Sequence, residues 1–256
     1  MTLRVDLNCD LGESFGRWRL GADEEVMRSI TSANVACGFH AGDPGTMRHT
    51  VELAARAGVA VGAHPGLPDL AGFGRRAMAV SAREARDLVL YQIGALDAFV
   101  RGTGLRLAHV KPHGALYNQA AHDEALATAL VEATAAYDAG LAFVGLPGSA
   151  MERAAGHAGV RFAAEVFADR AYRADGSLVP RGQPDAFVAD PVEAAARVVA
   201  MVREGRVRAA GGEWVAIRAD TVCVHGDNPH AVAMAAAIRA ALDAAGVAVA
   251  PLAAGA

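Results

Sequence analysis

The feature that most constrains the fold of this chain is a regular alternation between short apolar runs and longer segments with helical periodicity. The apolar runs predict strands at residues 3–9, 33–39, 59–63, 107–111, 142–146, 162–167 and 221–224, with 247–250 as a candidate last strand. The segments between them predict helices at residues 22–31, 45–57, 81–103, 121–138, 149–157, 190–204 and 229–245. Strict β-α alternation implies parallel strands, because parallel neighbours need a long crossover connection.

Helix start signals support four of these helices. Aspartate or asparagine followed by proline precedes three of them, and a serine precedes the fourth. These signals are Asp43-Pro44, Ser81, Asp190-Pro191 and Asn228-Pro229.

The alternation fits either a closed barrel or an open doubly wound sheet. The open sheet would favour a glycine-rich Gly-x-Gly-x-x-Gly turn after the first strand, but that strand runs into Cys9-Asp10-Leu11-Gly12-Glu13. Barrels of this class commonly take about 200–250 residues as one domain, and no linker divides this chain. We therefore predict an irregular α/β barrel, TIM-like, with about seven parallel strands in a single domain over residues 1–256.

Composition excludes several classes of protein. The 24 basic residues against 28 acidic ones give a net charge of −4, which does not favour nucleic-acid binding. No apolar run approaches the ~20 residues that span a bilayer, and the first ten residues lack the apolar core of a secretion signal. The three cysteines, at positions 9, 37 and 223, are predicted to be buried structural thiols. These observations predict a cytoplasmic protein without a membrane segment.

Polar residues end almost every predicted strand, which is where ligands bind in such barrels. Because alternate residues of a strand share a face, several polar sets are expected to point toward the barrel axis. These sets are Asp6, Asn8 and Asp10; Ala36, Gly38 and His40; Ala60, Gly62 and His64; His109, Lys111 and His113; and Cys223, His225 and Asp227. The small residues below His40 and His64 are expected to leave room for a small polar ligand.

Buried charges need partners, because desolvating an isolated ion costs far more than a fold tolerates. Three interpretations stay open. The groups could form structural ion pairs, they could act as general acids and bases, or Asp10, His40 and His64 could hold a divalent metal such as Zn²⁺. No compact His-Glu-x-x-His motif supports the metal site.

Two further features concern cations. Lys111 is the only lysine among the 24 basic residues, which suggests a position that needs a compact amine. Five arginines lie in two irregular segments, residues 64–76 and 169–189, the second predicted to be a lid or active-site loop. Arg75, Arg76, Arg170, Arg173 and Arg181 could bind carboxylate or phosphate there, or could be solvated surface residues. The common phosphate-binding Gly-x-x-x-x-Gly-Lys-Ser/Thr motif is absent from the sequence.

The strand-end motifs, taken in order, resemble the LamB/YcsF family over nearly the whole chain. They are Asp6-Leu-Asn-Cys-Asp-Leu-Gly-Glu13, Ala33-Asn-Val-Ala-Cys-Gly-Phe-His-Ala-Gly-Asp43, Gly62-Ala-His-Pro-Gly66, Gly72-Phe-Gly-Arg-Arg76, Val110-Lys-Pro-His-Gly-Ala-Leu-Tyr-Asn118, Glu165-Val-Phe-Ala-Asp-Arg170 and Val224-His-Gly-Asp227. The resemblance implies a barrel of the glycoside hydrolase and deacetylase superfamily. It also implies the A subunit of 5-oxoprolinase, an enzyme that opens the lactam 5-oxo-L-proline to L-glutamate with ATP as co-substrate, Mg²⁺ alongside, and separate B and C subunits.

The residue roles expected for this reaction rest on chemistry. Asp10, His40 or His64 would activate water, Lys111 and His113 would stabilise an oxyanion or phosphate, and Glu165 would serve the leaving nitrogen. Arg170 or Arg181 would hold the substrate carboxylate. The remaining expected substrate contacts are Asp6, Asn8, Glu13, Asp43, His225 and Asp227. Lys111→Met is expected to abolish turnover with little change in melting temperature.

Two other functions remain as alternatives. The same pocket could serve a metal-dependent amidase or sugar deacetylase that needs no ATP. Alternatively, the chain could be a non-catalytic component that only binds a lactam or a sugar, although simple binding rarely needs so many titratable groups.

Overall fold

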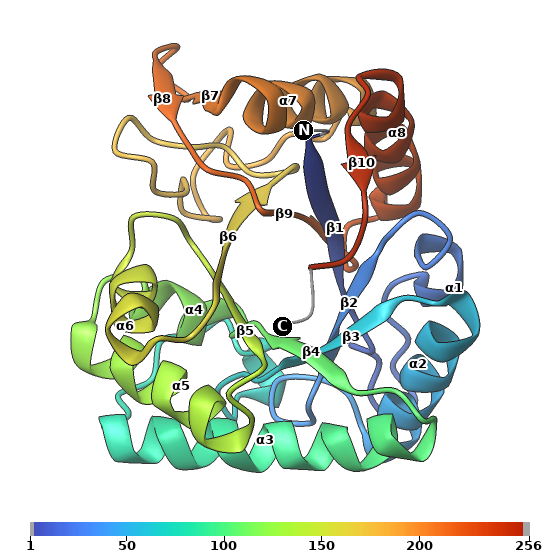
Figure 1. Cartoon of the computed structure of the whole chain (residues 1–256), viewed down its shortest axis with the longest axis vertical. Helices are drawn as coiled ribbons and strands as arrows, with labels where there is room; N and C mark the ends of the chain where they lie inside the picture. The colour runs from blue at the N-terminus through green and yellow to red at the C-terminus, as the bar shows by residue number, and fades with distance from the viewer. Residues whose placement is uncertain (1–2, 253–256) are drawn as a thin grey trace.

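Seven parallel strands close into a ring in the computed structural model, which describes residues 3–252 (Figure 1). Their order around the ring is β1, β2, β3, β4, β5, β6 and β9, and β9 pairs back onto β1. The bounds are β1 Arg4–Leu11, β2 Ser32–Ala36, β3 Ala60–His64, β4 Leu107–Val110, β5 Ala142–Gly145, β6 Phe162–Phe167 and β9 Thr221–His225. The predicted seven-stranded parallel barrel is therefore confirmed, and every ring strand overlaps a predicted one.

Helices surround this ring on all sides (Figure 1). Their bounds are α1 Asp23–Val26, α2 Pro44–Ala57, α3 Ala82–Gly102, α4 Gly114–Ala120, α5 Glu124–Tyr137, α6 Ala150–Ala158, α7 Pro191–Glu204 and α8 Ala231–Ala244, with a 3₁₀ turn at Leu70–Gly72. The predicted helix at 22–31 was too long, because only α1 forms before the chain turns into β2. The short helix α4, at the end of β4, was not predicted.

Side-chain caps explain where several helices begin. Asp43 accepts hydrogen bonds from the amides of Gly45 and Thr46, and Asp190 accepts one from the amide of Glu193. Ser81 and Glu84 form a reciprocal capping box at the start of α3. The fourth predicted signal was wrong in position: α8 begins after His230, and Asn228 instead accepts a hydrogen bond from the His230 amide.

Three short strands lie outside the ring. The candidate last strand is β10 (Ala248–Val249), which pairs with the first residues of β1 and does not enter the barrel. An antiparallel hairpin, β7 (Arg206–Arg208) with β8 (Trp214–Ala216), projects beyond α7 and was not predicted (Figure 1). Strands of three residues carry too little periodicity to be recognised in a sequence.

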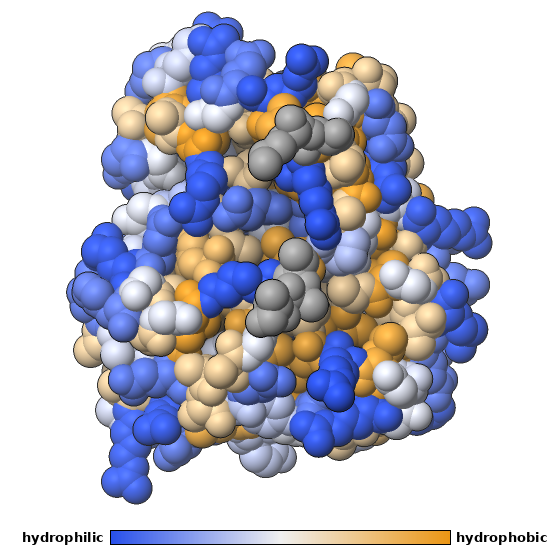
Figure 2. All heavy atoms as spheres, viewed as in Figure 1, coloured by the Kyte–Doolittle hydropathy of each residue, from blue (hydrophilic) through white to orange (hydrophobic). Residues whose placement is uncertain are grey.

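The apolar core lies between the strand ring and the helices. Outward residues of β1 such as Val5, Leu7 and Cys9 are fully buried in it, together with the inner faces of α3, α5 and α8. On the face shown in Figure 2, hydrophilic residues lie along the outline of the molecule and hydrophobic ones gather toward its middle. Within residues 3–252, no helix has the length and apolar character needed to cross a bilayer.

Polar side chains, in contrast, fill the inside of the barrel. Asp6, Asn8, Asn34, Glu165 and Thr221 are each at most 2% exposed and hydrogen-bond to one another between nearby strands inside the ring. Branched apolar residues usually dominate this position in such barrels. The inward register predicted for residues 6, 8 and 10 is confirmed by these contacts.

The segment between β6 and α7, residues 168–190, crosses over the carboxyl end of the barrel and is called the lid segment below. Two isolated bridges hold it together, Arg170 with Phe187 and Tyr172 with Leu178. Its position over the strand ends agrees with the predicted lid or active-site loop.

Candidate active site

The carboxyl ends of the strands bring most of the predicted site residues together in one buried region. A pocket there is lined by residues from β1, β3, β6 and β9, the turn after β4, helix α4, the loop that carries Arg75, and the lid segment. Its polar lining comprises Asp10, His64, Arg75, Lys111, His113, Tyr117, Asn118, Arg170, Arg181 and His225. The expectation that polar strand ends share one site is thus met by the geometry.

Lys111 lies at the centre of this region. Its Nζ is 2.7 Å from Oδ1 of Asp10, 2.8 Å from Oε1 of Glu165 and 3.0 Å from Sγ of Cys223. Burial alone would lower its pKa, but Asp10 and Glu165 raise the pKa of this ammonium well above its ordinary value. Lys111 is therefore a charged ammonium that bridges two carboxylates. Its three protons have acceptors in Asp10, Glu165 and Cys223.

That arrangement changes one expectation. A buried ion pair that loses one partner leaves an uncompensated charge, which costs about 3–5 kcal/mol. Replacement of Lys111 by methionine would leave two buried carboxylates without their cation, so the geometry favours a lowered melting temperature over an almost unchanged one.

Asp10 is held on one side only. Its Oδ1 accepts hydrogen bonds from Lys111 and from Nδ2 of Asn34 at 2.8 Å, whereas Oδ2 lies 3.4 Å from Nε2 of His64. Burial would raise the pKa of Asp10, but the neighbouring His64 and Lys111 side chains together bring it well below its ordinary value. Asp10 is therefore an ionised carboxylate with one oxygen directed toward the histidines.

Glu165 and Tyr117 carry polar atoms without hydrogen-bond partners; Tyr117 lines the pocket, and Glu165 contacts Lys111, which also lines it. Neither Oε2 of Glu165 nor the Tyr117 hydroxyl has a hydrogen-bond partner, and both are buried. Burial and the nearby Glu165 carboxylate raise the pKa of the Tyr117 phenol well above its ordinary value. Unpaired buried polar atoms are rare in proteins and are expected where a ligand supplies the missing partner.

Asp6 and Asn8 lie below the reacting end and are fully engaged. The carboxylate of Asp6 accepts from the hydroxyls of Thr31, Ser32 and Thr221, and Asn8 bonds to Thr221 and Asn34. The sequence predicted both as substrate contacts, but the structure gives them no free donor or acceptor toward the pocket. They support Asp10 and Glu165 from beneath.

The space expected below His64 is occupied. A Cβ atom added at Gly62 would lie 2.1 Å from Nε2 of His109, so the imidazole of His109 fills the room that the glycine leaves. Nε2 of His109 lies 2.7 Å from Oδ1 of Asn34. The prediction of ligand space at this level was therefore wrong, and the available pocket lies closer to the mouth.

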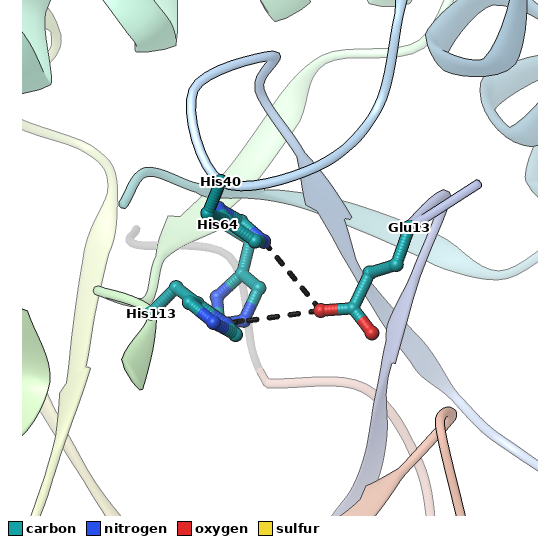
Figure 3. A group of neighbouring side chains, drawn as sticks. All are labelled: Glu13, His40, His64 and His113. Carbon is teal, nitrogen blue, oxygen red and sulfur yellow. Dashed lines mark hydrogen bonds and ion pairs between the residues drawn. The ribbon is translucent and has the colours of Figure 1, made fainter. Parts of the chain in front are cut away.

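Glu13 and three histidines form a second group beside the pocket. Figure 3 shows the carboxylate of Glu13 directed at His40, His64 and His113. One ligand atom from each residue lies within 4.8 Å of the others, and all four residues are buried. This group could hold a metal ion. A second such group within the described residues consists of Asp10, Cys223 and His225.

The lid segment supplies two arginines with different contacts. Arg170 donates to the carbonyls of Val179 and Ala186, so it ties the lid segment to itself, and its role as a free carboxylate binder is not favoured. Arg181 lies at the pocket with Nη2 2.9 Å from Nε2 of His225. His225 in turn faces Asp169 through Nδ1 at 2.9 Å, and that imidazole lowers the pKa of the otherwise desolvated Asp169.

The remaining predicted contacts lie farther out. Asp227 is paired with Arg75 at 2.7 Å, across the rim between two loops. Asp43 caps α2, and its second oxygen accepts from the amide of Gly16 at 2.7 Å. Asp43 therefore does not join the pocket, because both of its oxygens are engaged by backbone amides.

The sequence and the fold are both similar to those of known proteins. The model of the LamB/YcsF family matches residues 5–256. The chain belongs to the LamB/YcsF family. Among its relatives, the A subunit of 5-oxoprolinase from Pyrococcus abyssi is 58% identical over 250 residues, which cover 98% of each chain. The crystal structure of a lactam utilization protein from Thermus thermophilus superimposes with a TM-score of 0.93 at 52% identity, covering 98% of this chain and 100% of that one.

A more distant likeness concerns the fold alone. The catalytic domain of a peptidoglycan N-acetylglucosamine deacetylase from Eubacterium rectale has a TM-score of 0.53 at 10% identity, over 99% of this chain and 90% of that one. This LamB/YcsF chain therefore has the deacetylase-like irregular barrel that the sequence resemblance implied.

Sequence reasoning missed several residues of this LamB/YcsF site. Cys223 is one, because it was interpreted as a structural thiol although it lies 3.0 Å from the Lys111 ammonium; burial raises its pKa well above the ordinary value. The strand period had already placed it on the same inward face as His225, but it was not assigned to the site. Asn34, Tyr117 and Thr221 were missed too, since a neutral polar residue in an apolar run carries no charge signal.

Proposed function

We propose that this chain is the lactam-opening component of a 5-oxoprolinase, converting 5-oxo-L-proline to L-glutamate with ATP and with separate B and C subunits. The observation that carries the proposal is the similarity to the Pyrococcus abyssi protein whose name is that of the 5-oxoprolinase A subunit, over 98% of both chains. The pocket agrees with such a substrate, because it combines a cationic rim with a buried acid and amine below.

The substrate has a carboxylate at one end and a neutral lactam at the other. Arg181 is the guanidinium at the pocket best able to bind the carboxylate, since Arg170 is committed to lid carbonyls and Arg75 to Asp227. The lactam would then reach the unpaired Tyr117 hydroxyl and Glu165 Oε2. Of the three groups on the Lys111 ammonium, the Cys223 thiol is the weakest acceptor, so a lactam oxygen would replace that contact.

Activation by ATP addresses the low reactivity of an unstrained amide. Transfer of the γ-phosphoryl group to the lactam oxygen would make the ring carbon electrophilic. A water molecule would lose a proton to Asp10 Oδ2 or a neighbouring histidine and add to that carbon. The carbon–nitrogen bond would break as Glu165 relays a proton from the Lys111 ammonium to the nitrogen, and the proton taken from water would return to Lys111 through Asp10. A second water would convert the resulting acyl phosphate to carboxylate and inorganic phosphate.

A second candidate function rests on a different observation. The group of Glu13, His40, His64 and His113 has the composition of a metal site, so a metal-dependent amidase or deacetylase without ATP is the competing proposal. A non-catalytic binding role is less favoured, because binding alone gives no reason to bury Lys111 between two carboxylates.

The test is glutamate formation from 5-oxo-L-proline and ATP, with this chain alone, with the B and C subunits alone, and with all three. We expect glutamate only from the complete mixture. Equal activity without this chain would overturn the proposal, as would ATP-independent activity of this chain alone that a chelator abolishes.

A further inference from the structure

We propose that Glu13, His40, His64 and His113 form a binding site for one divalent ion of the Zn²⁺ class, at the inner wall of the active-site pocket. The four residues lie at or just after the carboxyl ends of four successive strands, β1 to β4, and their ligand atoms lie within 4.8 Å of one another (Figure 3). The inference concerns binding by this chain itself and does not depend on the proposed reaction.

Hydrogen bonds to backbone carbonyls fix which nitrogen of His64 and of His113 carries a proton. Nδ1 of His64 lies 2.7 Å from the carbonyl oxygen of Lys111, and Nε2 of His113 lies 2.8 Å from the carbonyl oxygen of Phe73. A carbonyl only accepts, so both of these nitrogens carry protons. In the neutral rings, the opposite nitrogens are therefore lone pairs, and these two lone pairs face each other at 3.0 Å.

The other two residues, His40 and Glu13, have buried polar atoms without hydrogen-bond partners. Neither ring nitrogen of His40 has a hydrogen-bond partner, although the residue is fully buried, and Oε1 of Glu13 is also buried without one. Leaving such groups unsatisfied disfavours the folded state, because they lose their hydrogen bonds to water. A proton shared between His64 and His113 would leave Nε2 of His40 and Oε1 of Glu13 unpaired, whereas a cation at the centre takes one ligand atom from each of the four residues.

Three separations between the ligand atoms are close to those that a small ion imposes, and all lie within 4.8 Å. Bonds of about 2.0–2.1 Å in a tetrahedron place the ligand atoms roughly 3.3 Å apart. The observed separations are 3.0 Å from His64 to His113, 3.5 Å from His40 to Glu13 and 3.7 Å from His113 to Glu13. Three imidazoles and one carboxylate favour Zn²⁺ over Mg²⁺ or Ca²⁺, which prefer oxygen ligands.

Backbone packing positions these rings. The chain at Gly74 has a φ of +62°, and a Cβ there would lie 2.6 Å from Cβ of His40 and 2.9 Å from Cδ2 of His113. Only glycine lets this loop approach the two stacked imidazoles, whose centroids are 3.7 Å apart.

The second candidate group does not offer a comparable site. Asp10 and Cys223 already contact the Lys111 ammonium, whose positive charge opposes a cation there. Both nitrogens of His225 have partners, Asp169 and Arg181. A bound ion is therefore assigned to the histidine group, where it would supply a Lewis acid beside the pocket.

The test uses the full, untagged chain, first stripped of metal with a chelator and then titrated with Zn²⁺. Calorimetry measures the affinity, and elemental analysis counts the bound ions. We expect one ion per chain. His40→Gln and Glu13→Gln should each weaken binding at least about 100-fold, since loss of even an outer partner costs about 10–100-fold. His225→Gln is the matched control and should bind as the unaltered chain does.

A second measurement avoids any variant that fails to fold. Zinc X-ray absorption on the unaltered chain should show nitrogen and oxygen ligands only. A sulfur ligand near ~2.3 Å would assign the ion to Cys223 and overturn the proposal. So would the absence of stoichiometric Zn²⁺, or unchanged affinity in both folded ligand variants. Because no substrate is present, these results are independent of the lactam assay.

Discussion

The only lysine of the chain, Lys111, is 2% exposed and joins Asp10 to Glu165 inside the barrel. Both carboxylates come from strands on other parts of the ring, so a single ammonium orders groups that are 101 and 54 residues away in sequence (111 − 10 and 165 − 111). Desolvation makes such a pair costly to break and favours a single arrangement of the site. Single-residue changes here are expected to affect stability and chemistry together.

Lys111→Met should therefore abolish glutamate formation and also destabilise the fold by about 3–5 kcal/mol, because two carboxylates lose their shared cation. Urea unfolding followed by circular dichroism measures the second effect. Arg28→Met, on the exposed surface after α1, is the control and should change stability by less than about 0.5 kcal/mol. Equal stability of the Lys111 variant would contradict the ion-pair assignment.

Two tyrosines provide a matched comparison. Tyr117→Phe should leave stability nearly unchanged, since its hydroxyl has no hydrogen-bond partner, yet should slow turnover up to about tenfold through a lost substrate contact. Tyr172→Phe should instead cost about 1–3 kcal/mol, because its hydroxyl accepts from the Phe167 amide at 2.8 Å. Thermal unfolding and steady-state kinetics separate the two. Reversed behaviour would refute the assignment of Tyr117 to the substrate.

At the scale of elements, loops after the strands carry the site, and strands and helices hold those loops in place. Asp43 illustrates the division: this strand-end acid, predicted to contact substrate, is the cap of α2. The lid segment illustrates it as well, because Arg170 is committed to lid carbonyls while Arg181 faces the pocket.

Asp43→Ala is expected to destabilise the protein by about 1 kcal/mol through loss of the cap, with kcat and KM of the complete enzyme unchanged. Asp87→Ala, at an exposed position within α3, is the control and should be nearly neutral. A rise in KM for 5-oxo-L-proline would restore Asp43 to the substrate site.

Arg181→Ala should raise KM for 5-oxo-L-proline by about 10–100-fold, the loss expected for a hydrogen-bonded ion pair with the substrate carboxylate. Arg173→Ala lies in the same lid segment but is exposed, so its KM should not change. The same increase in both variants would point to a general effect on the lid segment rather than to a contact of Arg181.

For the whole molecule, the closed ring and its inward polar faces were predictable, because the β-α alternation and the two-residue period of strands are local signals. Positions 6, 8 and 10 show this directly. The hairpin of β7 and β8 was not predictable, because strands of three residues are too short to show a two-residue period. The contact between Glu13 and the histidines was not predictable either, because it depends on the paths of the loops beyond the strand ends. The engaged states of Asp43 and Asp6 depend on tertiary partners that no spacing reveals.

The central claim is that this chain supplies the groups that open the lactam, and Glu165→Gln tests it most directly. The variant keeps the size of the side chain and removes its acid function. In the complete mixture with the B and C subunits, we predict that glutamate formation from 5-oxo-L-proline and ATP falls at least about 100-fold. Asp87→Asn in the same assay should retain full activity. Full turnover by a folded Glu165→Gln variant would contradict the account and place the ring-opening groups elsewhere in the complex.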